Sequence, residues 1–266
     1  MVTTFIIGRL ILSSGCRCLE GFGCSPIKRV RELGSLKNVN DIKLYIFKLK
    51  MTKLYYSSKT NSTINSISKE LNSILIGLLL GDAGLYRSSI TSNTRLEMSF
   101  GTNYKLFAEF IGDLLSSYMT NPVKSIEIAT NKKVYTNYRL KTKTLPIFNH
   151  YYDMFYKLDT DYDKFIKIVP NNIEILMNPI VLAYLIMSDG NFDKGRNRVR
   201  IYTNSFKRGD VQKLANAINK NLGIYTGVLY DRKDQWILTI GSKNLDLLRR
   251  TVKPYFHSSM CYRIGL

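Results

Sequence analysis

The feature that most constrains this chain is an apolar run that occurs twice and ends each time in an aspartate. The first run spans residues 75–83 and reads LIGLLLGDA, and the second spans residues 182–190 and reads LAYLIMSDG. They lie about a hundred residues apart, which is the size of a small domain. Each run is too short to cross a bilayer, which needs about 20 apolar residues. We therefore expect two related halves, each built around one copy of the run.

Both runs predict helices, because their flanks carry helix signals. Asn178 followed by Pro179 is a favoured helix start before the second run, and residues 68–71 lead helically into the first. The helices are expected to end at or just past Asp82 and Asp189. Gly84 and Gly190 then suit the left-handed turn that commonly ends a helix.

A helix that is apolar on all sides must be buried on all sides, and small residues in both runs indicate what covers it. Small side chains spaced along a helix let two backbones approach closely, so the two helices are expected to pack against each other. Tyr184 stands where the first run has Gly77, which predicts a looser contact on that side. The expected interface residues are Gly77, Gly81, Ala183 and Tyr184.

This packing would bring Asp82 and Asp189 side by side. Each carboxylate would lie at the negative end of its helix dipole and next to a like charge, and both effects are unfavourable. A divalent cation would reverse both costs. Oxygen ligands without thiolate or imidazole favour Mg²⁺ over Zn²⁺.

The charge of the chain indicates a polyanionic partner. Lysine and arginine number 39 against 20 acidic residues, giving a formal net charge of +19. Nucleic acid is the first candidate and an anionic membrane surface the second. The basic residues are spread over the whole chain, which favours a long phosphate track over a local membrane anchor. A basic protein without such a partner is the alternative on charge alone.

Three stretches in each half alternate apolar and polar residues, as half-buried strands do. They span residues 95–100, 125–130 and 134–141, and residues 196–203, 226–231 and 236–240. Helical spacing follows at 105–118, 146–156, 211–222 and 244–252, while a further strand just after each motif stays open. The prediction is an α+β fold with pseudo-twofold symmetry and one antiparallel sheet per half.

The polar faces of these strands are rich in Arg, Lys, Tyr and Asn. A curved sheet or two-stranded ribbon fits the DNA major groove. For any single residue a solvated strand face is an equal explanation, so the prediction depends on both halves showing the pattern. The candidate DNA-binding residues are Arg95, Tyr135, Asn137, Arg139, Lys141, Arg198, Arg200, Tyr202 and Asn204.

The two runs resemble the two signature motifs of single-chain LAGLIDADG homing endonucleases of the mitochondrial intron-encoded type. The likeness extends to residues 167–172 and Asn178-Pro179 before the second motif, and to residues 253–263 near the carboxyl end. It covers about residues 65–266. One apolar nonamer ending in Asp is weak evidence, but two at domain spacing in a basic chain are a specific signal.

The resemblance implies two LAGLIDADG subdomains, residues 65–170 and 171–266, after an N-terminal extension and linker of residues 1–64. Two antiparallel DNA-binding sheets would flank a central two-helix interface. It implies a monomer that makes a metal-dependent double-strand break at a long DNA site during intron homing in the mitochondrion, without membrane attachment. Mg²⁺ or Mn²⁺ would be held by Asp82 and Asp189 and by the residues before them, Gly81 and Ser188.

Two basic residues match positions where family members place charges around the active site. They are Lys167 and Arg263, and with the two aspartates they form the expected catalytic set. Such a charge can stabilise the transition state or orient the attacking water. Arg263 departs from the Lys of the family pattern, and a guanidinium cannot act as a general base at neutral pH. A slower reaction is expected where a proton must leave by that route.

Two other functions stay open: an RNA maturase that assists group I intron splicing on the same fold, and a DNA-binding relic that no longer cleaves. Retention of both Asp82 and Asp189 favours cleavage. Residues 1–60 read either as an organellar transit signal or as translated sequence upstream of an intron-encoded enzyme. Cysteines 16, 18 and 24 crowd this segment, but no fourth ligand lies near to complete a zinc site.

Overall fold

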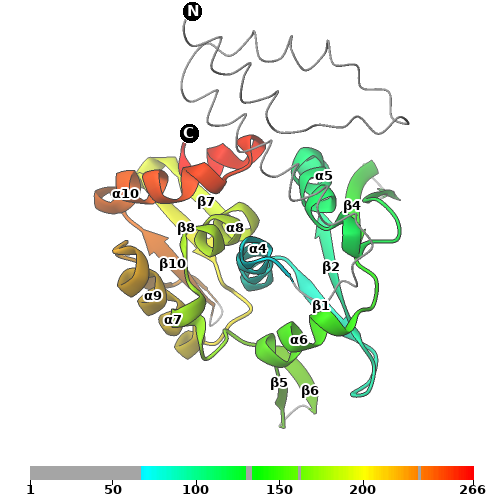
Figure 1. Cartoon of the computed structure of the whole chain (residues 1–266). Helices are drawn as coiled ribbons and strands as arrows, with labels where there is room; N and C mark the ends of the chain where they lie inside the picture. The colour runs from blue at the N-terminus through cyan, green and yellow to red at the C-terminus, as the bar shows by residue number, and fades with distance from the viewer. Residues whose placement is uncertain (1–66, 130–133, 161–162, 233–234) are drawn as a thin grey trace, which may run out of the picture. The chain divides into compact units, whose positions relative to one another are not determined.

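The computed structural model describes residues 67–129, 134–160, 163–232 and 235–266 (Figure 1). The expected N-terminal extension, with its transit and zinc interpretations, lies outside the described residues. None of the described helices is long and apolar enough to cross a membrane.

Two buried helices form the centre of the described chain, and they contact each other along their length (Figure 1). Helix α4 spans Lys69–Leu80 and α8 spans Pro179–Asp189. The Ser68 hydroxyl accepts a hydrogen bond from the Leu71 amide at the start of α4. Asn178 caps α8 by accepting from two backbone amides, as its position before Pro179 predicted. Both apolar runs form helices that are buried on all sides through Leu80 and Ser188. The expected end at or past the aspartate is confirmed for α8, which ends at Asp189, and is wrong for α4, which ends two residues before Asp82.

The expected left-handed turns after the two motifs are wrong. Gly190 has φ −78° and ψ 152°, and Gly84 is not among the described glycines with positive φ. Both glycines instead begin strands, β1 at Gly84–Arg87 and β7 at Gly190–Asp193. The chain passes almost directly from each motif helix into the first strand of a sheet, so no reversal of the backbone is needed.

Each half contains one four-stranded antiparallel sheet with the same strand order. The first has the order β1-β2-β4-β3, and the second has the order β7-β8-β10-β9. The remaining strands are β2 (Thr94–Phe100), β3 (Lys124–Ala129), β4 (Val134–Lys141), β8 (Arg198–Tyr202), β9 (Gly227–Tyr230) and β10 (Trp236–Ile240). The predicted α+β fold is confirmed, and the strand left open after each motif is present.

Helices cover one face of each sheet. The longer ones are α5 (Lys105–Leu114), α6 (Asn149–Phe155), α9 (Arg208–Leu222) and α10 (Ser242–Val252), with a short α7 (Ile173–Leu176). Short 3₁₀ helices span Thr102–Tyr104, Ser116–Tyr118, Pro146–Phe148, Lys194–Arg196, Lys253–Tyr255 and Ser258–Ile264. The covered faces are lined by side chains such as Leu96 and Leu140 in the first half and Val199 and Leu238 in the second. The opposite faces stay available.

A hairpin that the sequence patterns did not predict precedes the second half. Strand β5 spans Tyr156–Asp159 and pairs with β6 at Lys164–Lys167. The predicted aromatic helix therefore ends at Phe155. The Tyr156 hydroxyl accepts a hydrogen bond from the Leu85 amide at 3.1 Å, which ties β5 to β1.

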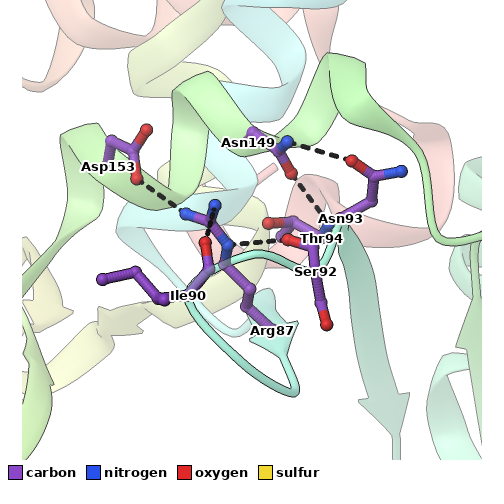
Figure 2. A network of polar contacts seen from close by, with 7 residues as sticks. All are labelled: Arg87, Ile90, Ser92, Asn93, Thr94, Asn149 and Asp153. Carbon is purple, nitrogen blue, oxygen red and sulfur yellow. Dashed lines mark hydrogen bonds and ion pairs between the residues drawn. The ribbon is translucent and has the colours of Figure 1, made fainter.

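A polar network fixes the loop between β1 and β2 against α6 (Figure 2). Arg87 donates to the carbonyl oxygens of Ser92 and Ile90, at 2.8 and 2.6 Å, and to Asp153 of α6 at 3.1 Å. Asn149 of α6 accepts from the Thr94 amide at 2.9 Å. Because one guanidinium satisfies three acceptors, the loop has a defined conformation at the end of the first sheet.

Candidate active site

The two motif helices approach closely because glycines face the partner backbone. A Cβ atom added to Gly77 would lie 2.6 Å from the Val181 carbonyl oxygen and 2.7 Å from the Cβ of Tyr184. One added to Gly81 would lie 2.4 Å from the Cβ of Ser188. Ordinary contacts between carbon atoms are about 3.5–4.0 Å. The expected looser contact at Tyr184 is wrong, because Gly77 leaves room for the tyrosine stem.

Ala183, the fourth residue expected at this interface, is fully buried. The atoms nearest to the two glycines nevertheless belong to other residues of α8, including Val181 and Ser188. The sequence therefore identified the two helices that pack, but not every residue that meets across the contact.

The close approach brings the two motif aspartates together. Asp82 follows the last turn of α4 and Asp189 ends α8, and their side chains are within hydrogen-bonding reach of each other. Burial is the largest cause that raises the pKa of both carboxyl groups, and the neighbouring Asp82 charge helps to raise that of Asp189 to about 8. The raised pKa values agree with the rule that two adjacent carboxylates cannot both ionise cheaply without a cation between them.

Lys167, at the end of β6, lies beside the carboxyl pair. Its Nζ donates to the main-chain oxygens of Gly81 and Ala83, each at 2.8 Å. Burial lowers the pKa of Lys167 to about 8, although the charges of Asp82 and Asp189 partly oppose that shift. The hairpin β5–β6 thus places an amine with a near-neutral pKa at the end of the first motif.

Arg263 has the corresponding place at the second motif. Its guanidinium donates to the Gly190 carbonyl oxygen and lies 5.3 Å from the ring centre of Tyr104 and 5.8 Å from that of Tyr262. Its charge acts on both aspartates, lowering their pKa values against the effect of burial. The two cations therefore flank the carboxyl pair, one on each side.

The donor set fits a hard divalent cation better than a soft one. Among the described residues no group of three or more His, Cys, Asp and Glu side chains gathers anywhere, so the candidate ligands are two carboxylates with main-chain oxygens or water. Of the other two expected ligands, Gly81 already accepts from Lys167 through its carbonyl oxygen. The Ser188 hydroxyl oxygen is buried and has no hydrogen-bond partner in the described structure.

The open face of the first sheet carries most of the polar residues expected to contact DNA. Arg139 and Lys141 of β4 pair with Ser99 and Glu97 of β2. Directly paired residues of antiparallel strands project from the same face of the sheet, and residues two positions apart on one strand share that face as well. This face carries Arg95, Tyr135, Asn137, Arg139 and Lys141.

The open face of the second sheet is built in the same way. Arg198, Arg200 and Tyr202 alternate along β8, and Arg200 pairs with Asn191 of β7 and Thr239 of β10. Asn204 lies instead in the exposed turn after β8. The structure thus brings all but one of the candidate residues onto the two open faces.

Several of these cations already have acidic partners on the same face. Arg198 bonds to Asp193 at 3.0 Å and Arg200 to Asp231 at 2.8 Å. Glu97 contacts both Arg95 and Lys141, and these two cations hold the pKa of its carboxyl group below the usual range against the effect of burial. The acids fix the arginine side chains in place, and they also reduce the net positive charge of each face.

The sequence patterns missed other members of the first open face. Tyr86 of β1 stacks under the guanidinium of Arg95 at 4.1 Å, and Lys124, Ile126 and Ile128 of β3 join through their pairing with β4. Alternation alone does not say which face of β3 is shared with β4. Only the register supplies that information.

A model of the LAGLIDADG DNA endonuclease family matches residues 72–248 of the chain. Cytochrome b mRNA maturase bI2 of Saccharomyces cerevisiae is 25% identical over 228 residues, which cover 83% of this chain and 52% of the maturase. The chain thus spans about half the length of that relative. The DNA endonuclease I-ChuI of Chlamydomonas applanata is 27% identical over 211 residues, covering 75% of this chain and 96% of the endonuclease.

A solved structure has the same fold. The homing endonuclease I-WcaI, bound to its DNA recognition sequence, superposes with a TM-score of 0.68 at 22% sequence identity. The match covers 80% of this chain and 92% of that protein.

Proposed function

The chain belongs to the LAGLIDADG DNA endonuclease family, and on that premise we propose that it is a homing endonuclease that cuts both strands of a long DNA site. The observation that carries the proposal is the meeting of Asp82 and Asp189 at the adjoining ends of α4 and α8. A structural helix pair has no need of two carboxyl groups with raised pKa values, and such groups are typical of catalytic sites.

The proposed site works through the two aspartates and the two flanking cations. Asp82 and Asp189 would hold Mg²⁺ or Mn²⁺, helped by oxygens of Gly81 and Ser188. A bound divalent cation supplies charge stabilisation and a more acidic attacking water in phosphodiester hydrolysis. Lys167 is oriented by two main-chain oxygens, and its near-neutral pKa lets it hold or accept a proton beside the first motif.

Arg263 has a different role from Lys167 in this proposal. Its guanidinium is held by Gly190 and stacked on tyrosine rings, and a guanidinium cannot act as a general base at neutral pH. It can neutralise charge on the phosphate but cannot take up a proton from water. We therefore propose that Lys167 and Arg263 serve the two DNA strands differently.

The two open sheet faces would bind the DNA on either side of this site. Their Arg, Lys, Tyr and Asn side chains suit phosphates and base edges in the major groove, and the net charge of +19 favours a polyanion. We place the boundary between the two halves at residues 170 and 171 and propose a monomer. Similarity to cytochrome b mRNA maturases supports a mitochondrial setting.

The deciding experiment compares the wild-type chain with Asp82→Asn and Asp189→Asn on DNA carrying an intronless copy of the insertion site. Both variants should lose at least about 100-fold in cleavage rate, since even outer-shell changes cost 10- to 100-fold in metal affinity or activity. DNA binding should persist. Asp246→Asn, which removes an exposed carboxylate on α10, is the matched control. Cleavage by the Asp82→Asn, Asp189→Asn double variant would remove the catalytic assignment.

Splicing assistance is the second candidate function, because two of the similar proteins are cytochrome b mRNA maturases. A maturase needs a nucleic-acid surface but not the aspartate pair. Binding of the host group I intron RNA, with splicing unchanged in Asp189→Asn, would support this function. Absence of RNA binding at physiological salt would exclude it.

A further inference from the structure

The outer edge of the first sheet presents aliphatic side chains on its open face. Ile126 and Ile128 of β3 pair directly with Asn137 and Tyr135 of β4, so all four side chains project from the same face. Ile128 is 38% exposed and Tyr135 is 47% exposed. The outer strand β3 therefore carries two aliphatic side chains on the open face of the sheet.

These isoleucines are not needed by the fold. Within the described part of the chain, neither belongs to the hydrophobic core nor packs against it. The core lies on the opposite face of the sheet, where Leu96 and Leu140 are fully buried. Ile128 is exposed and Ile126 is half-buried. Exposed β-branched residues on an edge strand are a liability that proteins usually avoid, which indicates that a partner covers this part of β3.

Charged neighbours indicate the chemistry of that partner. Lys124, two residues before Ile126 on the same face, pairs directly with Arg139 of β4. Both cations are exposed, and no acidic side chain of the described residues forms an ion pair with either of them; the acid of this face, Glu97, pairs with Arg95 and Lys141 instead. An apolar strip next to such cations suits DNA, because the cations can contact phosphates while the strip lies against base edges.

We propose that Ile126 and Ile128 contact the C5-methyl groups of thymines in the major groove and so select A·T pairs in the half-site bound by the first sheet. This inference rests on the proposed function. The thymine methyl is the apolar feature of the major-groove edge, and apolar side chains read it. Guanine and cytosine offer only hydrogen-bonding groups there, which an isoleucine would leave unpaired.

The selected pairs lie toward the outer end of that half-site. Strand β1 follows directly from Asp82, and β3 is three strands further out in the sheet. Three spacings of about 4.8 Å place β3 about 14 Å from β1. The contacts therefore fall several base pairs from the position of cleavage.

The second sheet has a weaker version of this feature. Its outer strand β9 presents Leu229 on the open face, 37% exposed, while its neighbour Ile237 is fully buried. Arg198 and Arg200 dominate that face instead. The two half-sites should therefore differ, with the stronger A·T selection in the half bound by the first sheet.

The test begins with the full-length chain and a random-sequence duplex library, from which bound sites are selected and sequenced. In the best site, each thymine of the outer half-site is replaced by deoxyuridine, which pairs in the same way but lacks the methyl group. Loss of one methyl contact should raise Kd about fourfold, the equivalent of about 0.8 kcal/mol. Replacements in the inner positions should have no such effect.

Variants assign the effect to the isoleucines. Ile128→Ala should bind the thymine site more weakly and should no longer distinguish thymine from deoxyuridine at one position, and Ile126→Ala should do the same at a neighbouring position. Val134→Ala is the matched control, because Val134 is 66% exposed on the opposite face of the same hairpin. It should keep the wild-type discrimination.

The outcomes separate this inference from the function it rests on. A selection that enriches no sequence overturns both. A protein that binds and cleaves its site, but tolerates deoxyuridine at every outer position, keeps the endonuclease function and overturns the thymine contact. Equal loss of discrimination in Val134→Ala and Ile128→Ala also overturns it, because the effect would then reflect the hairpin as a whole.

Discussion

Replacing Gly77 by alanine tests whether the close contact of α4 and α8 holds the molecule together. The added Cβ would lie 2.6 Å from the Val181 carbonyl oxygen and 2.7 Å from the Tyr184 Cβ. Both atoms are fixed to the α8 backbone, so no side-chain rotation relieves the clash. The helices would have to separate by about 1 Å to reach ordinary contact distances of about 3.5–4.0 Å.

The magnitude follows from two opposing effects. Overpacking a core typically costs about 1–3 kcal/mol, and the two backbone-fixed contacts place this case at the upper end. Alanine gains about 1 kcal/mol over glycine inside a helix. The expected net loss is about 2 kcal/mol in the free energy of unfolding, which lowers Tm by about 4–8 °C for a chain of this size.

Gly209→Ala is the control for helix propensity. Gly209 lies in the first turn of α9, and a Cβ added there meets nothing within 4 Å. This variant should be slightly more stable than the wild type, by about 0.5–1 kcal/mol. Thermal and urea denaturation of both full-length variants measures the difference. Equal stability of Gly77→Ala and Gly209→Ala would refute the argument that α4 and α8 pack closely only because Gly77 has no side chain.

Three further outcomes are expected. The free energy of unfolding of the metal-free protein should fall as the pH rises from about 4 to about 8. The reason is that the folded state keeps the proton of Asp189, whose pKa is raised to about 8, whereas the unfolded chain releases it. Denaturation of Asp189→Asn over the same pH range should show a weaker dependence of stability on pH. Lys167→Met should slow cleavage by about 100-fold or more with little change in Kd, and a loss confined to binding in a gel-shift titration would contradict its catalytic role. DNA affinity should fall with added salt by a slope of about −0.9 in log K against log salt for each phosphate contacted, so a nearly flat dependence would exclude the open sheet faces as the binding surface.

The central helix pair could be predicted from the sequence because its signals are local. An apolar run with a cap before it and an aspartate at or just after its end is a local signal, as α4 and α8 show. Two copies in one chain then predict the pairing of Asp82 with Asp189. Strand alternation is equally local, and it placed Arg139 and Arg200 on open faces.

The conformation of the glycines after each motif shows the limit of local rules. Gly190 was expected in a left-handed turn, but the next residues pair at once with β8, and that pairing keeps the chain extended. A Cβ on Gly190 would lie 2.5 Å from the Ile186 carbonyl oxygen. The glycine is thus required by close packing on the preceding helix turn rather than by its backbone angles.

The sequence by itself determined the two apolar motif helices, the repeated plan of each half and the basic character of the open faces, because these depend on residue types at short spacings. Only the tertiary structure decided that the β5–β6 hairpin brings Lys167 to Gly81, that Arg200 pairs with Asp231, and that Ile126 lies beside Asn137. Each of these contacts joins residues separated by more than ten positions. Their partners are selected by strand register and chain path, which no short pattern of residues encodes.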